Sequence, residues 1–67
     1  MTEIKNKFNQ ITKDAGFSIN ENKTIFTYGI IIVSFSVLED LERAIRLFSG
    51  EFKVSAEIDR LTLAILY

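Results

Sequence analysis

The segment Thr24–Phe35 (TIFTYGIIIVSF) decides the fold of this chain of 67 residues. It is dense in β-branched and aromatic residues, which are typical of β-strands. As a single strand it would extend for roughly 40 Å, at about 3.3 Å per residue, which is long for a small domain. Gly29 is the natural position for a bulge or a turn. The sequence leaves two arrangements open: one bent strand, or two short strands joined at Tyr28 and Gly29.

Both sides of this segment are apolar. In a single strand, one face would carry the even-numbered residues Phe26, Tyr28, Ile30 and Ile32. The other face would carry the odd-numbered residues Ile25, Ile31, Val33 and Phe35. Continuous apolar runs are typical of strands that are buried on both faces. We therefore expect something to cover the second face, unless Gly29 shifts the phase of the strand or one helix covers each face.

A helix is predicted before this segment. Ile4, Phe8, Ile11 and Ala15 follow one another at helical spacing, which indicates an amphipathic helix over residues 3–15. Gly16 stands where a helix often ends in the left-handed conformation.

A second helix is predicted after the segment. Ser36 and Glu39 match a capping box, in which each side chain bonds to the backbone N–H of the other residue. An apolar stripe then continues to Phe48, and Gly50 closes the helix. Glu39, Asp40 and Glu42 gather at its start, where negative charge is favourable. A site for a divalent cation or for a positively charged partner is the less favoured interpretation.

The C-terminal part of the chain predicts a β-hairpin. Residues 52–58 alternate between apolar and polar, and a second apolar run follows Asp59 and Arg60. A two-residue loop pairs Phe52 with Tyr67, Val54 with Ile65, Ala56 with Leu63, and Ile58 with Leu61. This register places all of these side chains on one face, as a buried sheet face requires. Asp-Arg is a poor pair for a tight hairpin turn, so a longer loop stays open.

The predicted order is helix, strand, strand, helix, strand, strand, in a single compact domain over residues 1–67. We expect a small two-layer α+β domain, with two helices packed on an antiparallel or mixed sheet of about four strands. A chain of this size buries only about 60% of its unfolded surface. Without disulfides or metals, such a chain depends on very good packing or on oligomerisation.

The residue types exclude several classes of function. The chain has no cysteine and no histidine, so it lacks a zinc-ligand set and the partners for Ser-His or Cys-His catalysis. We therefore expect no enzyme activity, no cofactor and no metal. The absence of cysteine fits a cytoplasmic setting. The longest apolar-rich run, Tyr28–Leu38, is too short to span a membrane.

The leading hypothesis is a non-enzymatic protein-interaction module. It would self-associate through its sheet as a homodimer, or dock on a larger protein as an inhibitor or accessory protein that occupies the partner's surface. A phage protein would suit this description. The expected interface residues lie on the exposed apolar face: Phe26, Tyr28, Ile30, Ile32 and Leu66.

The alternative is a small nucleic-acid-binding regulator. Lys5, Lys7 and Lys13 of the first helix would contact phosphates. Against this, the net charge is −1, and the run of basic, glycine and alternating aromatic residues that marks sheet-based RNA binders is absent.

Overall fold

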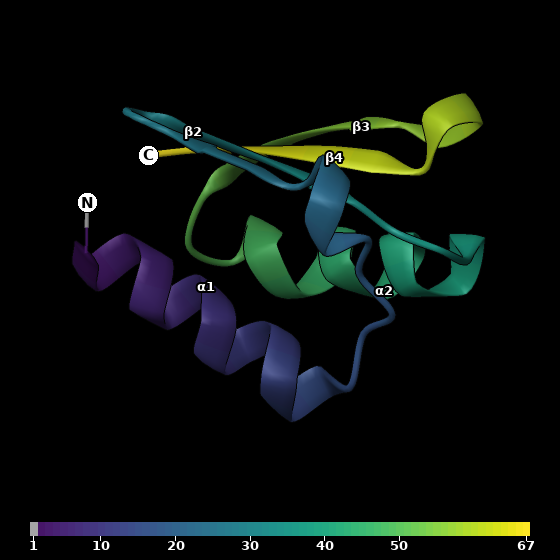
Figure 1. Cartoon of the computed structure of the whole chain (residues 1–67), viewed down its shortest axis with the longest axis horizontal. Helices are drawn as coiled ribbons and strands as arrows, with labels where there is room; N and C mark the ends of the chain where they lie inside the picture. The colour runs from purple at the N-terminus through teal and green to yellow at the C-terminus, as the bar shows by residue number, and fades with distance from the viewer. Residues whose placement is uncertain (1) are drawn as a thin grey trace.

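The computed structural model describes residues 2–67 and has the predicted α+β order (Figure 1). Its elements are, in chain order, α1 (Thr2–Ala15), η1 (Glu21–Lys23), β1 (Ile25–Thr27), β2 (Ile30–Ser34), α2 (Leu38–Ser49), β3 (Lys53–Glu57), η2 (Ile58–Arg60) and β4 (Thr62–Leu66). The four strands form one antiparallel sheet in the order β1-β2-β4-β3. Both η elements are single 3₁₀ turns.

The central apolar segment forms two strands and not one. Tyr28 and Gly29 make the turn between β1 and β2, and Gly29 has a φ of 91°, which a residue with a Cβ adopts only with strain. The chain reverses there, so Phe26 lies opposite Ile31, and Ile25 lies opposite Ile32. Of the two arrangements that the sequence leaves open, the structure has the turn.

This turn corrects the predicted grouping of Phe26 with Ile30 and Ile32. Residues that lie directly opposite each other in a sheet share a face. Phe26 therefore shares the face of Ile31, and its ring packs edge-to-face against Phe8 of α1 at 5.4 Å between centroids. Ile30 and Ile32 lie on the other face of the sheet.

The β3–β4 hairpin has the predicted register. Val54 pairs with Ile65 and Ala56 with Leu63, as the alternation of apolar residues requires. The connection is longer than two residues: η2 and Leu61 form it, and the amide of Leu61 donates to the carbonyl of Ile58. Leu61, and not Asp59 or Arg60, takes the left-handed conformation, with a φ of 54°.

Helix α2 begins later than the predicted capping box. Val37 is its N-cap, and no side chain caps the helix, so the predicted pairing of Ser36 with Glu39 is wrong. The amide of Ser36 donates instead to the carbonyl of Ser18, next to the bridge between Ile19 and Phe35. These long-range contacts keep the chain extended through Ser36 and delay the start of the helix.

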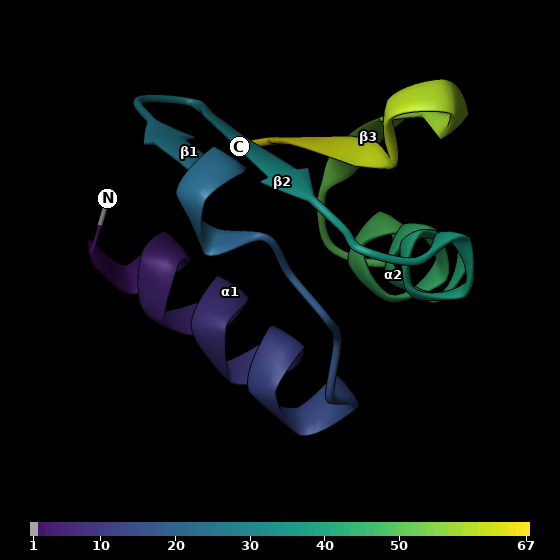
Figure 2. The ribbon, with the colours of Figure 1, turned by 45° about the vertical axis from the view of Figure 1, so that its right-hand side comes forward.

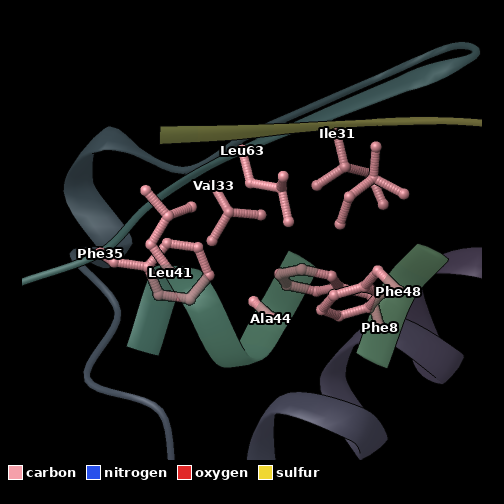
Figure 3. Close-up of a cluster of buried hydrophobic side chains, with 9 residues drawn as sticks. Phe8, Ile31, Val33, Phe35, Leu41, Ala44, Phe48 and Leu63 are labelled. Atoms are coloured by element: carbon pink, nitrogen blue, oxygen red, sulfur yellow. The ribbon is translucent and has the colours of Figure 1, made fainter. Parts of the chain in front are cut away.

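Both helices pack on the same face of the sheet. Figure 2 shows α1 on the side of β1 and β2, and α2 on the side of β3. The core between the layers is made of buried apolar side chains from both helices and from the segments that contain β2 and β4 (Figure 3): Phe8, Ile31, Val33, Phe35, Leu41, Ala44, Phe48, Leu63 and Ile65. No helix of the described residues covers the other face of the sheet.

Candidate interaction face

The helix-free face of the sheet carries a contiguous group of apolar side chains. We call this group the outer patch, and it consists of Ile25, Ile30, Ile32, Ala64 and Leu66. Its members are cross-strand neighbours on β1, β2 and β4: Ile25 lies opposite Ile32, Ile32 opposite Ala64, and Ile30 opposite Leu66. In Figures 1 and 2, α1 and α2 both lie on the opposite side of the sheet.

The outer patch is accessible to solvent. Ile25 is 50% exposed and Leu66 is 43% exposed, while Ile30, Ile32 and Ala64 are half-buried by their neighbours. Single exposed apolar residues are normal on a soluble protein. A contiguous apolar patch across three strands is typical of a surface that binds another molecule.

Polar side chains border this patch on the side of β3. Lys53, Ser55 and Glu57 lie on the same face, next to Leu66, Ala64 and Thr62 of β4. Protein interfaces commonly combine an apolar centre with a polar, solvent-accessible rim. The helix-free face therefore combines an apolar centre with a polar border along β3.

The structure brings three of the five predicted interface residues together: Ile30, Ile32 and Leu66. Tyr28 lies beyond them in the β1–β2 turn and is 94% exposed, whereas Phe26 belongs to the core face. Sequence reasoning missed Ile25, which reaches the outer face only because the chain reverses at Gly29. A turn signal at Tyr28-Gly29 was the only clue to its position.

The lysines of α1 do not form one surface. Successive residues turn by about 100° around a helix, which puts Lys5 and Lys7 on opposite sides of α1. The ammonium group of Lys5 lies 5.0 Å from the ring centre of Phe26, and Lys7 pairs with Glu51 at 2.8 Å. Lys13 lies exposed near the end of the helix. This arrangement gives the nucleic-acid alternative no continuous basic face.

A groove of about 370 Å³ lies between α1 and the η1–β1 segment. Apolar and polar residues line it: Lys5, Phe8, Asn9, Thr12, Ile19, Glu21, Thr24 and Phe26. Among the described residues, no hydrogen bond or ion pair joins Lys5 to Glu21, so the groove shows no assembled acid–base pair. Within the described part of the chain, no three acidic residues gather into a metal site.

Among the three acidic residues at the start of α2, Asp40 has a structural role. Asp40 is buried, and its Oδ2 accepts the amide of Ser18 at 2.8 Å. Its Oδ1 lies 3.4 Å from Nη1 of Arg43, and Nη2 of Arg43 donates to the carbonyl of Ala15 at 3.0 Å. The Asp40 carboxylate thus joins α2 to the segment after α1, while Glu39 and Glu42 remain exposed.

No helix in the described part of the chain has the length and hydrophobicity that a membrane span requires. Comparison with models of protein families, with curated proteins and with solved structures finds no match for this chain.

Proposed function

We propose that this chain is a non-enzymatic protein-interaction module that self-associates through the helix-free face of its sheet. The observation that carries this proposal is the outer patch, a contiguous apolar surface on three strands that neither helix covers. Removing apolar surface from water is the main driving force of protein association. A second copy of the chain carries the same outer patch, so two copies can cover each other's apolar surface without a different partner protein.

A two-fold axis parallel to the strands would bring two outer patches together. Such an axis, placed between β2 and β4, lays Ile30 of one copy over Leu66 of the other, and Ile32 over Ala64. Two sheets packed in this way lie about 10 Å apart and keep nearly aligned strands. Each outer-patch residue of β2 and β4 then packs against an apolar residue of the other copy, which is what a self-complementary interface requires.

A role as an inhibitor or accessory protein is part of this proposal. The small chain would act by occupying the surface of another protein, which would take the place of the second copy on the outer patch. The lack of histidine and cysteine supports a binding function over catalysis, and the lack of cysteine suits a reducing compartment such as the cytoplasm.

Leu66→Gln tests the proposal, with Leu47→Gln as a matched control. Leu66 on the outer face is 43% exposed, and Leu47 on α2 is 48% exposed, so the two variants change similar amounts of apolar surface. We expect Leu66→Gln to weaken self-association by about tenfold, the effect of losing about 1.4 kcal/mol at an interface anchor. Sedimentation equilibrium over a concentration series measures the change.

Leu47→Gln should leave the association constant unchanged, because Leu47 lies on the helix side of the molecule. A wild-type chain that stays monomeric up to about 1 mM, the limit of weak association, would contradict the proposal. Equal association constants for the two variants would contradict it as well.

A further inference from the structure

Strand β3 is the longer of the two edge strands of the sheet. The sheet order leaves β1 and β3 at the two edges. β1 has only three residues. The residues before it also contact the end of β2: Ile19 forms a bridge with Phe35, and the amide of Asn20 donates to the carbonyl of Ser34. β3 has five residues and no proline, and no strand within residues 2–67 pairs with its outer side. An edge of this kind presents unpaired backbone groups to a partner strand.

The hydrogen bonds of β4 show which backbone groups β3 directs outward. The amide of Tyr67 donates to the carbonyl of Gly29, and the amide of Phe35 donates to the carbonyl of Leu61. Both bonds continue the β2–β4 register. Backbone groups alternate between the two sides of a strand, so the odd-numbered residues of β4 bond to β2 and the even-numbered residues bond to β3.

The even-numbered residues of β4 lie opposite Lys53, Ser55 and Glu57, which therefore bond inward to β4. Val54 and Ala56 direct their N–H and C=O groups to the open edge. Among the described residues, no backbone hydrogen bond outside the sheet ladder engages either of them.

We propose that β3 pairs with β3 of a second copy, antiparallel and about a two-fold axis through Ser55. The two four-stranded sheets would then form one continuous sheet. This register places Val54 opposite Ala56 of the other copy, twice. Both residues direct their backbone groups outward, so each pair exchanges two hydrogen bonds.

The charges of β3 are complementary in this register. Lys53 lies opposite Glu57 of the second copy, and the symmetry repeats the pair. These are non-hydrogen-bonded positions, where opposite residues are closest, at about 4.5 Å between Cα atoms. Opposite charges in such pairs stabilise a sheet. Glu57 has an intramolecular ion pair with Arg60 at 3.6 Å, but both side chains are exposed, and such a pair contributes little.

The α2 surface beside this edge is also apolar. Asp40 and Arg43 contact the segment after α1, so they mark the side of α2 that faces away from the β3 edge. Leu38 and Ile45, seven residues apart, lie on the other side of the helix. Leu38 is exposed and Ile45 is half-buried. Edge pairing would bring the α2 helices of the two copies near each other and cover these side chains.

This edge is a different surface from the outer patch, so the two proposals can fail separately. The test uses a chain with Ile30→Asp, which places a charge in the outer patch and leaves β3 unchanged. If circular dichroism shows that Ile30→Asp is unfolded, Leu66→Asp replaces it, because it also places a charge in the outer patch. We expect this background variant to remain a dimer through the β3 edge.

Charge reversal then tests the edge itself. In the background variant, Lys53→Glu places two glutamates opposite each other in both pairs, and Glu57→Lys places two lysines there. We expect either reversal to weaken dimerisation by about tenfold or more. An equimolar mixture of the two reversed chains pairs Glu with Lys at both positions, so we expect the mixture to recover the mass of a dimer.

Cysteine cross-linking tests the register. The chain has no cysteine of its own. Ser55→Cys would place two thiols opposite each other on the axis, and we expect a disulfide-linked dimer under mild oxidation. Lys53→Cys is the control, because its two thiols would be four residues apart along the strands, or about 13 Å, which is too far for a disulfide.

Three results would overturn the proposal. One is a background variant that stays monomeric at every concentration. Another is a mixture of the reversed chains that is no heavier than either chain alone. The last is equal cross-linking of Ser55→Cys and Lys53→Cys.

Discussion

Two residues of α2 connect this helix to the segment that follows α1. Asp40 is buried and acts as the acceptor for the amide of Ser18, which follows α1. Arg43 lies beside Asp40, bonds to the carbonyl of Ala15, and places its guanidinium 5.1 Å from the ring centre of Phe17. These contacts link residues that are more than 20 positions apart in the sequence, as the separation of 22 for the Ser18–Asp40 bond shows.

Asp40→Ala should destabilise the fold, because it leaves the partly buried amide of Ser18 without its acceptor. The expected loss in the free energy of unfolding is about 1–3 kcal/mol. Asp40→Asn keeps an acceptor oxygen and should lose less. Glu39→Ala, an exposed neighbour in the same helical turn, should change stability by no more than about 0.5 kcal/mol. Urea denaturation of the variants measures these differences, and equal losses for Asp40→Ala and Glu39→Ala would contradict the assignment.

At the scale of elements, the β1–β2 turn decides which side chains reach the outer face. The turn depends on Gly29, whose φ is 91°. A Cβ at this position would meet no atom closer than the carbonyl oxygen of Tyr67 at 3.8 Å, so space does not restrict the residue. The need for glycine there is conformational.

Gly29→Ala should therefore destabilise the hairpin through backbone strain alone, by about 1–2 kcal/mol. Gly50→Ala is the matched control, because Gly50 has a φ of −68°, which alanine adopts readily. That change should leave stability unchanged or raise it by about 0.4–1 kcal/mol. Thermal unfolding followed by circular dichroism compares the two variants. A larger loss for Gly50→Ala than for Gly29→Ala would refute this explanation.

At the scale of the whole molecule, a single layer of side chains between the sheet and the helices holds the fold together. Phe8 of α1 stacks on Phe48 of α2 at 5.7 Å between ring centres, and both are buried against the sheet (Figure 3). Because the two helices share one face, the chain has one core and one uncovered sheet face. Small domains have little stability to spare, so each core position matters.

Alanine variants of Leu63 and Leu66 compare how much the two faces of β4 contribute to the stability of the monomer. Leu63 is 0% exposed, so Leu63→Ala should destabilise the monomer by about 2–5 kcal/mol. Leu66 faces outward on the same strand, and Leu66→Ala should lose less than about 1 kcal/mol when measured at concentrations where the chain is monomeric. Urea unfolding at low protein concentration tests this, and similar losses for both variants would contradict the assignment of the two faces.

The order of the elements and the β3–β4 register follow from the sequence alone. Both depend on local periodicity: helical spacing in Ile4 to Ala15, and alternation in residues 52–58. Alternation assigns each side chain to a face, so a shift of one residue would have moved the apolar side chains of β3 to the wrong face.

Only the tertiary structure decided the rest. The reversal at Gly29 moved Phe26 into the core and Ile25 onto the outer face, and contacts of Ser36 with Ser18 delayed the start of α2. The partners of Asp40 also lie outside local patterns. Each of these features depends on energies between residues that are far apart in the chain. These contacts form only when the layers pack together, so a short stretch of sequence cannot predict them.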